Sequence, residues 1–599
     1  MCACSGDPTE PYTPQSNLLP AIPSINFGIA TPQELTLAES TQRELLDYAR
    51  ALCDGTTPKT ASLSLQALQQ DIIPILYGPD GRRAASKRLN GTDATLARLD
   101  THVPSMCAKV PNDSRLHLLV IGYTARFPNL GIKGFFDQKV FEPMVHGIAY
   151  EYKGHRVELD PMMQVEKNFK SSSVRHYLSL TLGLRPQQTP AENALTIEVY
   201  KAIHIGEQKT DGAFSRYFRG HQPVQADSVT HELMEQRLGW IGDWYRNNVI
   251  DGEVTYEYAT SRGEYQNESR TMVRSTMAVW ILNRLAEYLQ SESLKAAGTV
   301  TIQYYLDHYF QIESSRRAGT IQPSPKALPN GNLVAYRFTT ASFIAAAILE
   351  RQDWEQSAQE VSLLMDFAMA YKRPDHVIWT ENGNSQFFMP GQLLLAVAYA
   401  YDRTRDPKYL TYFDEVFSTY APVLTQLMTL APETVAPYAP AWFTQPATKM
   451  YQITGDEKYL PLIFKINDRV LLNYERNASF QVHEDYDGML APKLGSFGNN
   501  SITAAALEAL VDAAIAAKQS GDLARYERYR SACRHAVAFL LRLQFTPNNT
   551  YYMAHSERVM GGFKKDMVNT TSWMDNVWHL TSAFIKIQNA RLFEDLEAP

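Results

Sequence analysis

The chain has 599 residues, of which 45% are hydrophobic and 20% charged, as in folded globular proteins, and its formal net charge is −7. This balance, with acidic and basic residues interspersed, argues against a nucleic-acid-binding protein, which relies on a strongly basic surface. No stretch approaches the roughly 18 uninterrupted apolar residues of a membrane span, so we expect no membrane partner.

The N-terminus lacks the basic and apolar regions of a secretory signal, and the cytoplasm is the expected compartment. Residues 1–35 are rich in Pro, Ser and Thr and are predicted to form an extended arm. Cys2 and Cys4 form a C-x-C pair that could bind a soft metal, but no second Cys/His pair lies nearby, so we predict no metal and no cofactor. Five cysteines in this length do not indicate a disulfide framework, and three are isolated and expected to be buried or inert: Cys53, Cys107 and Cys533.

Residues 36–215 are predicted to form an α+β domain. A capped amphipathic helix comes first and ends at Gly55. The apolar run 115–125 suits a buried strand. In residues 147–161 the side chains alternate between two faces on either side of Lys153-Gly154, as in a β-hairpin. Residues 194–207 are a further strand candidate. The order of a helix followed by strands resembles, in outline, the small AMMECR1-type domain.

Residues 216–599 are predicted to be mainly α-helical and to form helix pairs. The first helix of each pair is small and apolar, which is typical of a buried helix, whereas the second carries a charged stripe that faces water. Inner helices alternating with outer helices six times indicate an (α/α)6 toroid. The last pair is short, and residues 225–248 are a candidate to complete it. The pairs are 266–313, 338–372, 391–424, 440–475, 501–544 and 573–599.

A repeated phrase marks the turns within these pairs. "DRTRDPKYL" at 402–410 and "QITGDEKYL" at 452–460 each place an Asp where it can cap the second helix, and "SGDLARYERY" at 520–529 is a looser copy. Gly455 suits the left-handed turn that ends the first helix. Three turns in register favour a repeat architecture.

With these turns, and with "GGF…D…H" near the end, the C-terminal region resembles the six-hairpin glycosidase-like superfamily. Its members include unsaturated glucuronyl hydrolases, N-acylglucosamine 2-epimerases and the C-terminal domain of glucuronyl C5-epimerases. The resemblance implies a carbohydrate-active enzyme of the hydrolase, lyase or epimerase type that acts on a saccharide.

The long connections between pairs gather at one face of such a toroid, where the inner helices begin. Helix N-termini there favour anionic or polyhydroxylated ligands. Aromatic, amide and Arg side chains at these starts are the predicted substrate-binding residues, and the two Arg favour a uronic acid. A structural salt bridge for the two Arg and a core role for the two Trp are the alternatives. The residues are Tyr256, Arg270, Arg274, Tyr336, Gln392, Trp442 and Trp573.

Acid–base chemistry on a sugar needs paired proton donors and acceptors. Asp575 and His579 lie at i and i+4 on the last inner helix, and we predict Asp575 as acid or base oriented by His579. The "HEDYD" segment at 483–487 is predicted to supply the partner, Asp487 in preference to Glu484. The alternatives are a buried His–Asp pair that braces the helix and a solvated acidic turn.

Two departures from the superfamily favour a second hypothesis. Gln392 follows Gly391 where several relatives carry Glu, and the paired His of a 2-epimerase site is missing. A toroid without catalysis would serve as a binding or assembly module for a protein or glycan. A homodimer of this chain is then a possible assembly.

Overall fold

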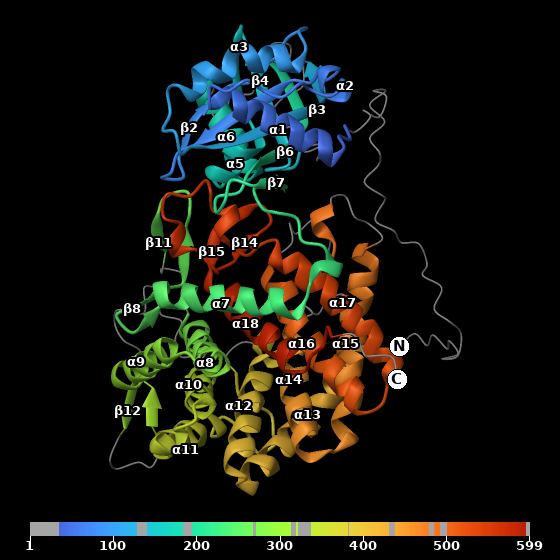
Figure 1. Ribbon diagram of the computed structural model, residues 1–599. Helices are drawn as coiled ribbons and strands as arrows, with labels where there is room; N and C mark the ends of the chain where they lie inside the picture. The colour runs from blue at the N-terminus through green and yellow to red at the C-terminus, as the bar shows by residue number, and fades with distance from the viewer. Residues whose placement is uncertain are drawn as a thin grey trace, which may run out of the picture.

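The computed structural model describes ten stretches of the chain, in which an α+β region lies above a ring of helices (Figure 1). The described stretches are residues 35–128, 141–183, 195–266, 271–312, 319–321, 337–380, 383–430, 438–478, 484–490 and 500–594. No helix among them is both long and apolar enough to cross a membrane.

The α+β region is built on one antiparallel sheet of seven strands, in the order β2-β1-β3-β6-β4-β5, with β7 also paired to β6. The strands are β1 (Ile72–Tyr77), β2 (Arg83–Ser86), β3 (Arg115–Pro128), β4 (His146–Tyr152), β5 (His155–Leu159), β6 (Leu195–Glu207) and β7 (Phe214–Tyr217). The helices are α1 (Glu39–Cys53), α2 (Leu63–Gln66), α3 (Thr95–Cys107), α5 (Pro161–Glu166) and α6 (Ser171–Thr181).

The predicted elements of this region are confirmed. The first helix is α1, and Gly55 after it has φ +67°, the left-handed conformation that glycine adopts without strain. The apolar run from Arg115 is β3, and the segment 194–207 contains β6. The predicted hairpin is β4–β5, whose turn residues Lys153 and Gly154 have φ 51° and 78°.

The two faces of the sheet pack against different parts of the chain, following the alternation of a strand. On β1, Ile72 and Leu76 pack with α1 and α3. Ile75 and Tyr77 point to the opposite face, where they share a core with Tyr551 from the C-terminal region. The Tyr77 and Tyr551 rings meet edge to face with centroids 5.1 Å apart. The sheet is therefore docked on the helical region through aromatic contacts.

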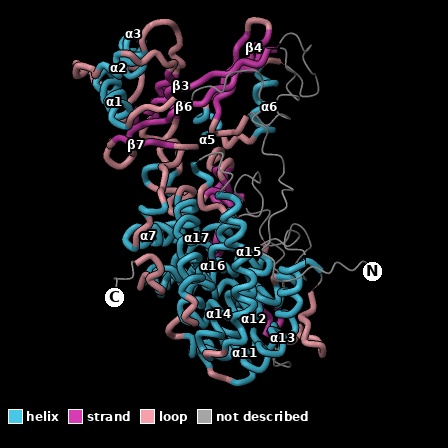
Figure 2. The backbone as a smooth tube through the Cα atoms, turned by 90° about the vertical axis from the view of Figure 1, so that its right-hand side faces the viewer, coloured by secondary structure: helices cyan, strands magenta, loops and turns pink. Residues whose placement is uncertain are grey.

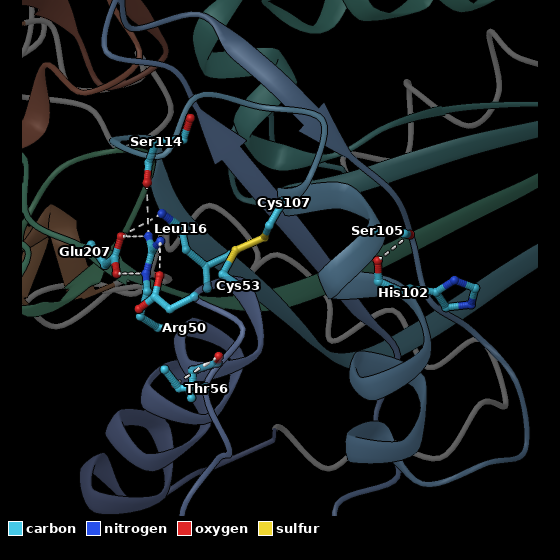
Figure 3. Close-up of a disulfide and its surroundings, with 11 residues drawn as sticks. Arg50, Cys53, Thr56, His102, Ser105, Cys107, Ser114, Leu116 and Glu207 are labelled. Atoms are coloured by element: carbon cyan, nitrogen blue, oxygen red, sulfur yellow. Dashed lines mark hydrogen bonds and ion pairs between the residues drawn. A yellow bond between two sulfur atoms is a disulfide. The ribbon is translucent and has the colours of Figure 1, made fainter.

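A disulfide joins Cys53, at the end of α1, to Cys107, at the end of α3, with Cα atoms 5.3 Å apart (Figure 3). The prediction that these two cysteines are isolated is wrong, because the two helix ends meet in space although 54 residues separate them in sequence. Beside the bond, Arg50 donates to the Glu207 carboxylate at the end of β6 (Figure 3). Cys533 is free and buried, as expected.

The helical region is a closed (α/α)6 toroid, which confirms the predicted fold. Each inner helix packs beside the next, and the sixth packs back on the first. The inner helices are α8 (Met272–Tyr288), α10 (Arg337–Glu350), α12 (Met389–Thr404), α14 (Tyr438–Thr454), α16 (Asn500–Gln519) and α18 (Met574–Asn589). The outer helices are α9 (Glu292–Tyr309), α11 (Ala358–Met369), α13 (Pro407–Leu430), α15 (Leu460–Ala478), α17 (Leu523–Leu541) and α7 (His231–Asn248).

The sequence patterns explain this ring. On α10 every side chain from Phe338 to Leu349 is buried, as the apolar pattern of an inner helix requires. The repeated turns are the connections from inner to outer helices, where Asp406 accepts from the Lys408 N–H and Asp456 from the Lys458 N–H. The outer partner of α18 is α7, so the first helix of the region completes the last pair.

A small antiparallel sheet lies between the ring and the α+β region (Figure 1), and the prediction of a mainly α-helical region over residues 216–599 did not include it. Its order is β11-β10-β15-β14, and two further strand pairs flank the ring. The short strands are β8 (Val249–Ile250), β9 (Glu253–Val254), β10 (Glu257–Ala259), β11 (Glu264–Gln266), β12 (Phe310–Ile312), β13 (Gly319–Ile321), β14 (Lys564–Asp566) and β15 (Asn569–Trp573). Strands of two to five residues show no readable alternation, and β10 pairs with β15 from the far end of the sequence.

Candidate functional site

The small sheet places several predicted site residues at the start of α18. In the β10–β15 pair Glu257 lies opposite Trp573, and the Met574 N–H donates to the Tyr256 carbonyl at 3.0 Å. Trp573 is the residue before α18, and Asp575 lies in the first turn of that helix. Two segments more than 300 residues apart are thereby fixed together at the mouth of the toroid.

Arg274, in the first turn of α8, joins this group. Its Nε lies 3.1 Å from Asp575 Oδ2, and its Nη1 donates to the Tyr256 hydroxyl at 2.5 Å. Burial raises the pKa of Asp575, and the positive charge of Arg274 opposes that rise. Asp575 Oδ1 is buried and has no hydrogen-bond partner among the described residues. The carboxyl group thus has one paired oxygen and one unpaired oxygen.

His579, one turn further along α18, is not bonded to Asp575. Its Nδ1 bonds to Glu508 Oε2 of α16, and the Glu508 side chain is fully buried. The imidazole ring lies against Trp578, with centroids 3.5 Å apart, and Trp442 of α14 lies 5.9 Å away. In the described part of the chain no residue bonds to Nε2 of His579. The structure therefore pairs His579 with Glu508, which the prediction missed.

The starts of α12 and α14 approach closely, and Gly391, the residue before Gln392, lies against the backbone of Trp442. A Cβ on Gly391 would lie 2.7 Å from the Trp442 carbonyl oxygen, so only glycine lets the two helices approach this closely. Gln392 is buried, and its Oε1 has no partner among the described residues. The Trp442 ring lies 5.9 Å from the Trp578 ring of α18, so α14 and α18 are in aromatic contact near the mouth.

A second cation lies at the mouth beside Arg274. Lys565 of β14 pairs with Glu257 at 2.7 Å, and its Nζ lies 4.5 Å from the Trp573 ring centroid. The Arg274 and Lys565 side chains are 39% and 32% exposed, whereas their carboxylate partners are buried. Both cations are therefore partly exposed at the mouth.

Buried charges continue along the inner helices beyond the mouth, and reading only the helix starts misses them. Lys586 of α18 bonds to Asp512 of α16 at 2.6 Å and to Gln445 of α14 at 2.9 Å. Glu508 and Asp512 are the acidic residues of α16, four positions apart in a helix that is otherwise almost wholly apolar. An acidic pair on one face of a buried helix is a signal that could have identified both.

The "HEDYD" segment does not join this group through any described contact. Asp485 pairs with Arg219 at 2.7 Å, and Tyr486 donates to Glu142 of the α+β region at 2.6 Å. Asp487 Oδ2 lies 2.8 Å from Nδ1 of His535 on the outer helix α17. Among the described residues, no hydrogen bond or ion pair links the Asp487 side chain to Asp575. This cluster instead holds the α+β region and an outer helix together.

Three of the predicted residues cannot be placed. Arg270 and Tyr336 lie outside the described residues, and the side chain of Glu484 is likewise not described. In the part of the chain that is described, no three His, Cys, Asp or Glu side chains form a group suited to a metal ion.

No protein-family model matches this sequence, and the comparison with curated proteins found no match. Solved structures with a similar arrangement include the GH76A α-1,6-mannanase of Salegentibacter sp. HEL1_6, with 12% identity, 60% of this chain and 99% of that chain covered, and a TM-score of 0.41. A D-mannose isomerase shares 13% identity, with 60% and 98% covered and a TM-score of 0.42. An unsaturated glucuronyl hydrolase variant of Streptococcus agalactiae shares 13% identity, with 61% and 98% covered and a TM-score of 0.41.

Proposed function

We propose that this protein is a carbohydrate-active enzyme of the hydrolase, lyase or epimerase type, which acts on a saccharide by acid–base chemistry at the mouth of the toroid. The observation that carries the proposal is the arrangement on α18, where a buried carboxyl group with an unpaired oxygen lies one turn from a carboxylate-bound imidazole. Proton transfer to and from a sugar needs such a pair of groups close together in a site from which water is excluded.

The two groups suit different tasks. The raised pKa of Asp575 keeps its proton at higher pH than an exposed Asp would, which suits a general acid. Glu508 on Nδ1 of His579 favours the proton on that nitrogen and leaves a lone pair on Nε2, which suits a general base. The sequence prediction had His579 orient Asp575; in this proposal Glu508 orients His579, and Arg274 is the residue paired with Asp575.

The walls of the mouth suit a hydroxyl-rich ring. Asp575 Oδ1 and Gln392 Oε1 are buried acceptors that sugar hydroxyl groups would satisfy, and the buried rings of Trp442 and Trp573 make their surroundings apolar. The partly exposed positive charges of Arg274 and Lys565 support a carboxylate on the substrate, so we propose a uronic-acid-containing saccharide.

Asp487 has no role as an acid or base in this proposal. Its carboxylate is bonded to His535 on an outer helix, and Gly488 after it has φ 92° and lies against the backbone of the same residue. These contacts fix the segment on α17, and a role in anchoring explains them.

The test is a screen of the purified protein against uronic-acid, amino-sugar and neutral oligosaccharides, with products followed by NMR. On a substrate found in this way, Asp575→Asn and His579→Gln should each lower kcat by about 10²–10⁴-fold. Asp487→Asn is the matched control, since it neutralises another carboxylate that is bonded to a His, and it should keep the wild-type rate. If all three variants lost the same factor in kcat, or if none lost any, the assignment of Asp575 and His579 as the reacting groups would be overturned.

A non-catalytic module for a protein or glycan partner is the second candidate, and two observations favour it. An amide occupies the Gln392 position, and Asp575 is already paired with Arg274. In that case the screen would find a saccharide that binds without being converted, and Asp575→Asn would change its affinity and no rate.

A further inference from the structure

Asn168 of the α+β region hydrogen-bonds to the strand that leads into the start of α18. Asn168 Nδ2 donates to Asn569 Oδ1 at 3.0 Å and to Thr571 Oγ1 at 3.3 Å, and its Oδ1 accepts from the Thr570 N–H at 2.8 Å. All three partners belong to β15, whose last residue is Trp573. The amide of Asn168 uses its donor and its acceptor together in these contacts.

The position of Asn168 follows from the way α5 ends. The Asn168 N–H bonds to the Val165 carbonyl and the Phe169 N–H to the Gln164 carbonyl, which is the Schellman pattern. Asn168 has φ 53°, the left-handed conformation that Asn tolerates better than most residues. The end of a short helix therefore holds this amide at a fixed point on the surface of the domain.

α5 is itself fixed to the sheet of the α+β region. Gln164 accepts from the Met144 N–H at 2.9 Å and donates to the His146 carbonyl at 2.8 Å. Arg83 of β2 bonds to Asp160 at 2.6 Å and to Glu166 at 2.9 Å, on either end of the helix. Figures 1 and 2 show α5 at the junction between the sheet and the helical region.

Strand pairing on the β10 side of β15 is short. On its other edge β15 pairs with β14, where Asn569 lies opposite Asp566 and Ser572 opposite Lys564. The pairing with β10 covers only Ser572 and Trp573, so Thr570 has no partner in β10. Asn168 bonds to the Thr570 N–H, while the Thr260 hydroxyl donates to the Thr570 carbonyl at 3.2 Å. Side chains thus add to the β14 pairing in the first part of a strand that runs directly into Asp575.

We infer that Asn168 is a positioning residue for the site: through β15 the α+β region sets where Trp573 and Asp575 lie. The catalytic part of this inference rests on the proposed function, whereas the mechanical part does not. The N-terminal region is then a component of the toroid's site and not a separate module.

The chain offers a matched control for this contact. Asn548 also makes three hydrogen bonds between the two regions, accepting from the N–H and hydroxyl of Thr210 and donating to Gln208 at 2.5 Å. Asn548 does not belong to β15. Asn168→Ala and Asn548→Ala therefore remove the same number of contacts between the regions, at different places.

The experiment is hydrogen–deuterium exchange on the full chain, which needs no substrate. Asn168→Ala should speed exchange in peptides covering 569–576 at least tenfold, and Asn548→Ala should leave those peptides at the wild-type rate. Wild-type exchange of 569–576 in Asn168→Ala, or equal acceleration by both variants, would overturn the inference.

On a confirmed substrate, Asn168→Ala should lower kcat about tenfold or more with little change in KM, since a misplaced reacting group costs rate. Asn168→Asp keeps the acceptor for Thr570 and loses the donor, and should recover part of the exchange protection. If the exchange result holds and no saccharide is converted, the proposed function fails while the mechanical role of Asn168 stands.

Discussion

The guanidinium of Arg219 lies 2.7 Å from the carboxylate of Asp485, and the two side chains are 0% and 2% exposed. Arg219 follows β7 of the α+β region, and Asp485 belongs to the segment that precedes α16 of the toroid. Arg219 also bonds to Glu142 and to the Pro143 carbonyl, so a single cation connects three segments. Because both side chains are buried, the attraction between the two charges offsets the cost of removing each from water.

Arg219→Leu should lower the free energy of unfolding by about 3–5 kcal/mol, because Asp485 is left as an uncompensated buried charge. Urea unfolding followed by circular dichroism measures the change. The control is Arg216→Leu on the exposed side of β7, which should stay within about 0.5 kcal/mol of wild type. Wild-type stability in Arg219→Leu would show that the ion pair does not hold the two regions together.

Stability should fall as the pH drops below about 6.5, the ordinary His value. Burial lowers the pKa of His204 to about 3 and holds those of His117 and His221 well below the usual value. The unfolded chain therefore binds more protons than the folded chain in acid, which favours unfolding. Each such group contributes about 1.4 kcal/mol per pH unit once the unfolded His is protonated.

Urea midpoints at pH 7.5 and 5.5 test this dependence. His221→Phe should reduce the difference between the urea midpoints at the two pH values. At pH 7.5 its free energy of unfolding should equal or exceed that of the wild type, because both ring nitrogens of His221 are buried without hydrogen-bond partners among the described residues. Equal pH dependence in the variant and the wild type would exclude His221 as a source.

Cys53→Ser should lower the free energy of unfolding by up to about 4 kcal/mol, the chain-entropy value for a loop of this length. The bond closes a loop between residues separated by 54 positions. Unfolding in the presence and absence of a reductant measures the effect. The reduced wild type and the variant should then have the same free energy of unfolding. A wild type whose stability does not change with the reductant would contradict the prediction.

Arg237→Met should raise the free energy of unfolding by about 1–3 kcal/mol, because it removes buried donors whose missing hydrogen bonds cost that much. Nε and Nη1 of Arg237 on α7 are buried without partners among the described residues, and burial lowers the pKa of the group to about 10. Thermal unfolding at pH 7.5 measures the gain. Arg246→Met, which removes a half-exposed cation of the same helix, should give no gain.

The toroid was predictable because its signals are local. The apolar inner helices, the striped outer helices and the Asp-capped turns at Asp406 and Asp456 are each set by residues within a few positions of one another. The strands around Lys153-Gly154 were readable for the same reason. In the candidate site, the sequence placed Asp575, His579, Arg274 and Trp573 at or near the starts of inner helices, and the structure has them there.

Which side chains meet was decided only by the tertiary structure. His579 pairs with Glu508, 71 positions away, and Arg274 pairs with Asp575 because α8 and α18 close the ring. Asp487 has the residue type and the neighbours of a catalytic acid, yet its bond to His535 follows from how its segment packs on α17. Sequence by itself determined the periodicity that builds each helix. Partner choice depends on distances between helices, which arise from packing across the whole ring and are encoded in no single stretch of the chain.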